Sequence, residues 1–255
     1  MSADKTDKDL SILSIQGVSV AYGGGSPVVS DFSLEVPQGE TFGLIGLNGV
    51  GKTTLIKATL GLRAYQKGEI RIGGLDSRHP DSKKNLAYLP ERFDPAWFLK
   101  GIEFLRFSVR LYNLPFDEAA AHLLCEKLAL DPAVLARRVQ TYSKGMRQKL
   151  GLIGTLLTKC PLLILDEPMS GLDPQARALV KDALGVARAG GQTIFFSSHI
   201  LADMNEICDR VGVLHGGNLV YTGTPAGLIA AGGDANIERA FLNLIHAGER
   251  GQKAA

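Results

Sequence analysis

Residues 46–54 read Gly-Leu-Asn-Gly-Val-Gly-Lys-Thr-Thr, and this segment constrains the fold more than any other part of the chain. Its glycines permit backbone angles that side chains forbid, so successive N–H groups can converge on phosphate oxygens at a helix N-terminus. A lysine at this spacing reaches the β- and γ-phosphates, and the following hydroxyl ligates Mg²⁺. The pattern therefore predicts a site for a nucleoside triphosphate with Mg²⁺. The residues expected to bind it are Gly46, Asn48, Gly49, Gly51, Lys52, Thr53 and Thr54.

The flanking segments supply the structural context that such a loop requires. Residues 41–45 form a short apolar run typical of a buried strand, and residues 55–60 continue with the composition of a helix. A chance glycine-rich turn is the alternative, but it accounts for neither the lysine and threonines nor these flanks. We therefore expect a strand, a phosphate-binding loop and a helix in that order.

A second constellation follows more than a hundred residues downstream. The apolar run 162–165 ends in Asp166, Glu167 and Pro168, which predicts a buried parallel strand with two carboxylates at its carboxyl end. Open α/β sheets bind ligands at that end. Asp166 is expected to hold magnesium directly or through water, and Glu167 to polarise a water for attack on the γ-phosphate. Taken alone, the segment is also compatible with an ordinary turn after a strand.

A third segment, residues 142–150, reads Tyr-Ser-Lys-Gly-Met-Arg-Gln-Lys-Leu before an apolar run. Ser143 is a candidate helix N-cap with Gly145 beside it, so the segment offers a second helix N-terminus with free amides for an anion. By itself a serine and a glycine before a helix usually mark only a cap.

In this order the motifs resemble the nucleotide-binding subunit of an ABC transporter across about residues 12–225, nearly the whole chain. The resemblance implies that Tyr22 stacks on adenine, that Glu91 is the Q-loop residue and contacts the metal, and that His199 is the switch histidine that contacts the γ-phosphate and, like Glu167, is catalytic. It further implies metal ligation by Thr53, Glu91 and Asp166. The residues implied to complete the site of a second subunit form the signature motif, Ser143, Lys144, Gly145 and Met146, and Asp173 belongs to the D-loop.

Two departures from the family pattern are visible. The signature is Tyr-Ser-Lys-Gly-Met where the family usually has Leu-Ser-Gly-Gly-Gln, and Glu91 stands where glutamine is usual. A carboxylate at position 91 remains a magnesium ligand but adds negative charge near the phosphates. Both variants resemble single-domain ATPases that pair with type-2 exporter permeases, which implies export. Local alternatives for Tyr22 and His199 are a turn aromatic and a strand-end histidine.

The expected fold is α/β: a P-loop NTPase core with a mainly parallel sheet, an antiparallel β lobe and an inserted α-helical lobe. Residues 1–11 are expected to be a disordered tail, 12–231 the ATPase domain and 232–255 a C-terminal helix and tail. Apolar residues at three- and four-residue spacing place the helical lobe at about 92–155, and glycines and prolines break strands within 12–40. Asp173 and Pro174 open another helix, which Gly190 ends.

Composition bears on partners and location. A formal net charge of +2 gives no electrostatic case for nucleic acid, and no apolar stretch approaches the ~20 residues that span a bilayer. The start of the chain also lacks a signal-peptide core. We expect a cytoplasmic protein bound at the inner face of the membrane through a separate permease, with a second ATPase subunit, most simply an identical one. A soluble ABC-type ATPase acting on ribosomes or DNA is the alternative, and a P-loop kinase would leave the signature unexplained.

Three further expectations concern particular side chains. Phe93, Trp97 and Phe98 are candidates for the permease-docking surface, the alternative being that they fill the core of the helical lobe. The basic pairs Lys83–Lys84 and Arg137–Arg138 are expected to be solvated. The odd set of cysteines is expected to pack as small core residues rather than as disulfides or metal ligands. These cysteines are Cys125, Cys160 and Cys208.

Overall fold

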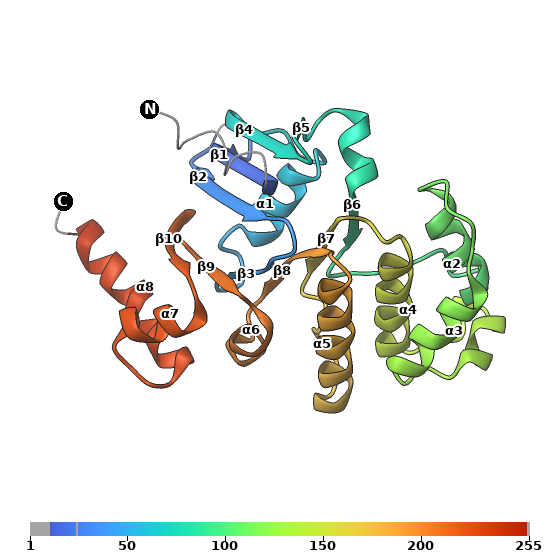
Figure 1. Cartoon of the computed structure of the whole chain (residues 1–255). Helices are drawn as coiled ribbons and strands as arrows, with labels where there is room; N and C mark the ends of the chain where they lie inside the picture. The colour runs from blue at the N-terminus through green and yellow to red at the C-terminus, as the bar shows by residue number, and fades with distance from the viewer. Residues whose placement is uncertain (1–10, 24, 254–255) are drawn as a thin grey trace.

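A computed structural model describes residues 11–23 and 25–253. The tail expected over residues 1–11 lies outside the described residues except for Ser11. Ser11 is the first residue of the first strand and pairs with Pro37. Because the backbone hydrogen-bond ladder begins there, Ser11 belongs to the folded domain. Figure 1 shows two sheets flanked by helices, with a group of helices standing to one side.

The larger sheet carries the site because of its strand order, β10-β9-β3-β8-β7-β6. Strands β9 to β6 run parallel and β10 pairs antiparallel at the edge. Since β8 lies between β3 and β7, the carboxyl ends of these three strands meet at one edge. Every residue of β3, β7 and β8 is buried, as in a sheet covered on both faces. The strands are β3 (Thr41–Ile45), β6 (Leu86–Leu89), β7 (Leu162–Asp166), β8 (Thr193–Ser198), β9 (Arg210–His215) and β10 (Asn218–Gly223).

The smaller sheet is antiparallel in the order β2-β1-β4-β5. Its long strands alternate buried and exposed residues, so one face packs on the core and the other faces solvent. This confirms the predicted β lobe, and it places Tyr22 directly after the end of β1. The strands are β1 (Ser11–Ala21), β2 (Pro27–Pro37), β4 (Lys67–Ile72) and β5 (Leu75–Asp76).

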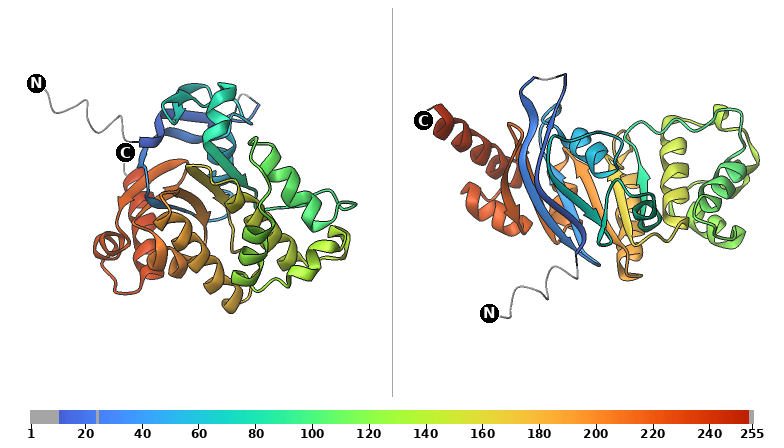
Figure 2. Two further views of the ribbon diagram at one scale, coloured as in Figure 1. Left: turned by 45° about the vertical axis from the view of Figure 1, so that its right-hand side comes forward. Right: turned by 90° about the horizontal axis from the view of Figure 1, so that it is seen from above.

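The helical lobe contains α2 (Gly101–Arg110), α3 (Glu118–Lys127) and α4 (Lys144–Leu157). Figure 2 shows these helices beside both sheets, as expected of an inserted lobe. The apolar spacing predicts the helices correctly, but part of the stripe faces outward: the exposed fractions of Phe107 and Leu111 are 55% and 65%. The lobe therefore keeps apolar surface that its own core does not use.

The remaining helices cover the larger sheet. Asp173 caps the helix that begins at Pro174 by accepting from the Ala176 N–H at 2.8 Å, and Gly190 ends that helix, as predicted. The C-terminal helix buries Phe241 and Ile245 and packs mainly on α7, so it is a packing element. These helices are α1 (Lys52–Thr59), α5 (Pro174–Ala189), α6 (Leu201–Ile207), α7 (Pro225–Gly232) and α8 (Ile237–Lys253). Within residues 11–23 and 25–253 no helix is both long and apolar enough to span a membrane.

The cysteines confirm one expectation and Lys83 corrects another. Cys125 and Cys160 are buried and Cys208 is partly buried, all as free thiols. Lys83 is not solvated: its ammonium donates to the carbonyls of Leu60 at 2.6 Å and Ser77 at 2.5 Å, and burial lowers its pKa. Its side chain ties the short 3-10 helix Pro80–Asn85 to the end of α1.

Candidate active site

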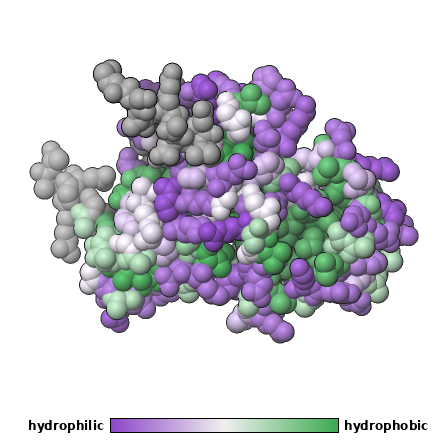
Figure 3. Space-filling view, viewed as in Figure 1, coloured by the Kyte–Doolittle hydropathy of each residue, from purple (hydrophilic) through white to green (hydrophobic). Residues whose placement is uncertain are grey.

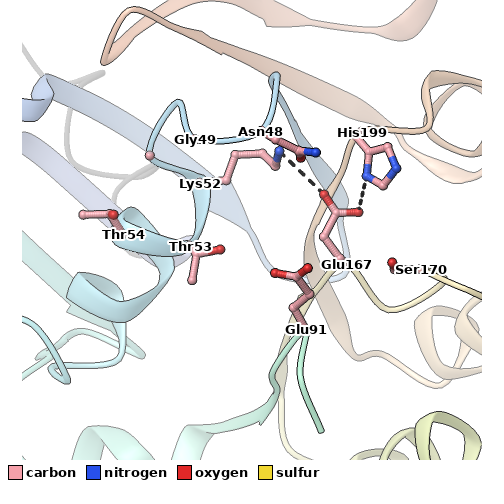
Figure 4. Close-up of a pocket in the computed structure, with 10 residues that line it drawn as sticks. Asn48, Gly49, Lys52, Thr53, Thr54, Glu91, Glu167, Ser170 and His199 are labelled. Atoms are coloured by element: carbon pink, nitrogen blue, oxygen red, sulfur yellow. Dashed lines mark hydrogen bonds and ion pairs between the residues drawn. The ribbon is translucent and has the colours of Figure 1, made fainter. Parts of the chain in front are cut away.

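A cavity of about 400 Å³ lies where the carboxyl ends of β3, β7 and β8 meet. Figure 4 shows its side chains, which come from segments far apart in the chain. The structure thus brings together most of the residues predicted from the P-loop with Glu167 of the carboxylate pair, Glu91 and the histidine at the switch position. The lining residues are Asn48, Gly49, Gly51, Lys52, Thr53, Thr54, Glu91, Glu167, Ser170 and His199.

The loop between β3 and α1 has the backbone that a phosphate site needs. Gly49 and Gly51 adopt φ values of +84° and +111°, which side-chain-bearing residues rarely reach. A Cβ on Gly46 would lie 2.7 Å from the Leu214 carbonyl oxygen, so this glycine lets the loop pass close to β9. No acidic residue occupies the first turn of α1. The partial positive charge of the helix N-terminus is therefore left for an anionic ligand.

Lys52 is buried at the start of α1, and three oxygens surround its ammonium. Nζ donates to the carbonyl of Gly46 at 2.6 Å and, at 3.4 Å, to that of Leu47. It also lies 3.6 Å from Oε1 of Glu167, and both of these side chains are less than 10% exposed. A buried cation facing the cavity is what a phosphate-binding lysine requires.

Asp166 and Glu167 follow one another at the end of β7 but have different surroundings. Oδ1 of Asp166 accepts a hydrogen bond from the Ser197 hydroxyl at 2.5 Å. The Glu167 N–H donates to the same hydroxyl at 3.1 Å and to the Ser197 carbonyl at 3.2 Å. Glu167 has φ +50°, a left-handed conformation that is uncommon outside glycine. Ser197 on β8 thus holds both acidic residues through side-chain and backbone contacts.

His199 completes a chain of polar contacts across the cavity. Its Nδ1 lies 2.8 Å from Oε2 of Glu167, while Oε1 of the same carboxylate faces Lys52. Glu167 therefore lies between a cation and an imidazole, as the dashed lines in Figure 4 show. The His199 side chain is 47% exposed and lines the cavity.

The residues expected to hold Mg²⁺ fit a hard cation by chemistry and by one structural observation. Oδ2 of Asp166 is buried without a hydrogen-bond partner among the described residues, which is a costly arrangement for a carboxylate unless a cation compensates it. Thr53 and Glu91 line the cavity, and Figure 4 shows the Glu91 carboxylate turned toward the same space as Glu167. The predicted donor set is thus made of oxygens, which magnesium prefers.

Tyr22 lies at the rim rather than in the lining of the cavity. Its hydroxyl is 3.0 Å from the hydroxyl of Thr54, and the residue is 47% exposed. A ring held next to the phosphate loop with exposed surface is suitably placed to stack on a base.

The predicted signature residues lie outside this cavity. The Ser143 hydroxyl accepts from the Met146 N–H at 3.2 Å, so Ser143 caps α4 as expected. Lys144 lies against the D-loop, residues 170–173, where a Cβ on Gly171 would come 3.0 Å from the lysine Nζ. Gly145 would place a Cβ 3.6 Å from Leu172, and Asp173 is engaged as the cap of α5. Within one chain the signature motif packs on the D-loop and does not line the cavity that contains Lys52.

Sequence reasoning did not assign a role to two hydroxyl side chains of the site. Ser170 lines the cavity next to Glu167, and Ser197 orders both carboxylates. A signal for Ser197 was present in the sequence, since this residue stands two positions before His199 at the end of an apolar run. Its role depends on the register Asp166↔Ser197, which only strand pairing reveals.

Comparisons with known proteins identify the family of the chain. Residues 29–170 match the family described as ABC transporter. An uncharacterised ABC transporter ATP-binding protein of Synechocystis is 39% identical over 76% of this chain and 56% of its own length. The chain therefore spans little more than half of that relative. The Nod factor export ATP-binding protein I of Cupriavidus pinatubonensis is 34% identical over 86% of this chain and 68% of its own length.

A solved structure described as the ATP-binding subunit of an ABC transporter superposes with a TM-score of 0.83. It is 32% identical and covers 91% of this chain, which in turn covers 99% of it. The fold and the site together define a P-loop ATPase. The chain belongs to the ABC transporter family and is an ATP-binding ATPase domain of that family.

Proposed function

We propose that the chain binds ATP with Mg²⁺ at the cavity around Lys52, hydrolyses it as a two-fold homodimer and powers export through a separate membrane permease. The observation that carries this proposal is the Lys52–Glu167–His199 arrangement beside a phosphate-binding loop. In this family the same chain also supplies a signature helix, and here that helix lies outside the cavity.

The chemistry assigned to each side chain follows from its contacts. Lys52 and the N–H groups at the start of α1 bind the β- and γ-phosphates, and Glu167 accepts a proton from the attacking water. His199, anchored on Glu167 at 2.8 Å, orients that carboxylate and contacts the terminal phosphate through its free side. Bound Mg²⁺, held by Thr53, Asp166 and Glu91, would neutralise phosphate charge. Tyr22 stacks on the base.

The separation of the two half-sites supports the proposed homodimer. The Ser143 hydroxyl caps α4. Because the first amides of a helix have no partner within the helix, we expect those of α4 to bind an anion held by another molecule. A head-to-tail pair related by a two-fold axis places the signature helix of each copy over the P-loop of the other. Two equivalent sites then form together, and ATP is the group that joins the subunits.

Permease docking is supported by apolar surface on the helical lobe. Trp97 and Phe98 are 64% and 58% exposed and contact each other edge to face, so they do not fill the lobe's own core. Beside them Phe93 packs edge to face on Phe104 at the margin of an apolar cavity of about 200 Å³, which Phe107 also lines. Figure 3 shows apolar surface gathered over this lobe. Export as the direction is supported by the similarity to the Nod factor export ATP-binding protein I of Cupriavidus pinatubonensis.

The decisive experiment compares wild type with Glu167→Gln in Mg²⁺-dependent ATP hydrolysis and in nucleotide-dependent dimerisation. Glutamine keeps the shape of the side chain but cannot accept the water proton, so turnover falls by about 100-fold or more while ATP stabilises a dimer. The control is Glu126→Gln on the exposed face of α3, which leaves both readouts unchanged. Wild-type turnover in the Glu167 variant, without an ATP-dependent dimer, would reject the assignment.

A further inference from the structure

The ring of Tyr22 is held from two directions. Its hydroxyl lies 3.0 Å from that of Thr54, which fixes one edge of the ring beside the phosphate loop. The guanidinium carbon of Arg63 lies 3.6 Å from the ring centroid, which is a close cation–π stack. Arg63 therefore covers one face of the ring, and the 47% exposure of Tyr22 leaves surface for a second planar group.

No acidic side chain among the described residues pairs with Arg63 to explain its position. Among the residues that the structure describes, its contacts are the Tyr22 ring and the Ala21 carbonyl oxygen at 3.5 Å. The same loop after α1 also binds the end of β1 through Gln66, whose side-chain oxygen accepts from the Ala21 N–H at 2.8 Å. The loop after α1 thus binds the end of the strand that precedes Tyr22. The planar guanidinium of Arg63 stacks on the ring instead of forming an ion pair, so its interaction is with the aromatic face of Tyr22.

We propose that Arg63 is a positioning residue for the nucleotide base: it stacks behind Tyr22, fixes the plane of the ring and leaves the opposite face for adenine. This inference rests on the proposed ATP-binding function and adds to it a residue that the family motifs do not include. The cation and the base then occupy the two faces of one ring. Arg63 affects the base only through Tyr22 and makes no contact with the phosphates.

The test measures binding of ATP and of inorganic tripolyphosphate to the full chain with Mg²⁺, both by competition against a fluorescent ATP analogue. Arg63→Ala weakens ATP binding by about fivefold, because the ring is no longer held in plane, and leaves tripolyphosphate binding unchanged. In steady-state hydrolysis the KM for ATP rises by the same factor while kcat is retained. Arg63→Lys, which restores the charge without the planar stack, recovers part of the loss.

A double-mutant cycle separates a role through Tyr22 from a direct one. Tyr22→Leu alone weakens ATP binding by about tenfold, and adding Arg63→Ala to it has no further effect. The matched control is Arg78→Ala, which removes a guanidinium 5.4 Å from the Tyr65 ring outside the cavity and leaves ATP binding as in wild type.

Several results would overturn the inference. Tighter ATP binding by Arg63→Ala would mean that the guanidinium occupies the face used by the base. An equal loss of tripolyphosphate affinity would make Arg63 a phosphate ligand or a residue needed for folding, and thermal unfolding tells these apart. An undiminished effect in the Tyr22→Leu background would show action independent of the ring. If wild type binds neither ATP nor tripolyphosphate, the proposed function fails, and this inference fails with it.

Discussion

Removing the hydroxyl of Ser197 is the sharpest structural test of the site. In Ser197→Ala, Asp166 loses the hydrogen bond that Oδ1 accepts at 2.5 Å, and the Glu167 N–H loses one of its two acceptors. Asp166 is 1% exposed and its Oδ2 already has no hydrogen-bond partner among the described residues. The variant therefore leaves a buried carboxylate without a hydrogen bond from any of those residues.

A hydrogen bond to a buried charge contributes about 1.5–3 kcal/mol to stability. A loss of about 2 kcal/mol in a chain of this size lowers Tm by about 4–8 °C. Ser198→Ala is a matched control, because Ser198 is also buried but its hydroxyl accepts from an uncharged group, the Ile200 N–H, at 3.0 Å. Its expected cost is about 1 kcal/mol, or about 2–4 °C.

The assay is thermal unfolding of the purified chain without nucleotide, followed by circular dichroism. Asp166→Asn removes the charge, so adding Ser197→Ala in that background costs less than it does in wild type. Equal Tm losses for the two serine variants would refute the reasoning, because the charge on Asp166 would then make no difference. So would an additive result in the Asp166→Asn background.

Two further predictions concern other parts of the molecule. Trp97→Ala reduces co-purification of the permease with the tagged chain at least tenfold without lowering Tm, since Trp97 is 64% exposed. The control is Leu62→Ala, which removes a similarly exposed side chain after α1 and retains the permease. A folding defect in Trp97→Ala would contradict the docking assignment. Burial raises the pKa of the Cys125 thiol to about 11. At pH 8 this cysteine therefore reacts with a thiol reagent at least about 100-fold more slowly in the native chain than in denaturant, as measured by mass spectrometry of labelled peptides. Equal rates would disprove its burial.

The main elements of the core were predictable because their signals are local. Residues 41–45 and 162–166 are short apolar runs that can only be satisfied inside a covered sheet, and both became fully buried strands. The caps of α4 and α5 followed from Ser143 and Asp173, whose side chains accept backbone N–H groups three residues ahead. Interactions within one turn of chain leave a readable pattern.

What escaped sequence reasoning depends on contacts between distant segments. Lys83 looked like half of a solvated pair, but its amine is held by carbonyls at positions 60 and 77, which only the folded chain brings near. Phe107 and Leu111 have helical spacing, yet periodicity does not say which stripe faces the core when a helix has apolar residues on more than one side. The guanidinium of Arg63 over Tyr22 likewise joins positions 41 residues apart, with no pattern linking them.

The backbone conformation at Glu167 links the strand predicted from local sequence to the contacts between distant segments that form the site. In a regular strand, consecutive side chains point to opposite faces of the sheet, and the backbone continues in extended form. The left-handed conformation at Glu167, φ +50°, redirects the chain immediately after Asp166. Such a conformation costs about 1–3 kcal/mol, and the two hydrogen bonds from the Glu167 N–H to Ser197 offset it. The strain is thus stored where one carboxylate must stay buried at the strand end and the next must face Lys52 and His199.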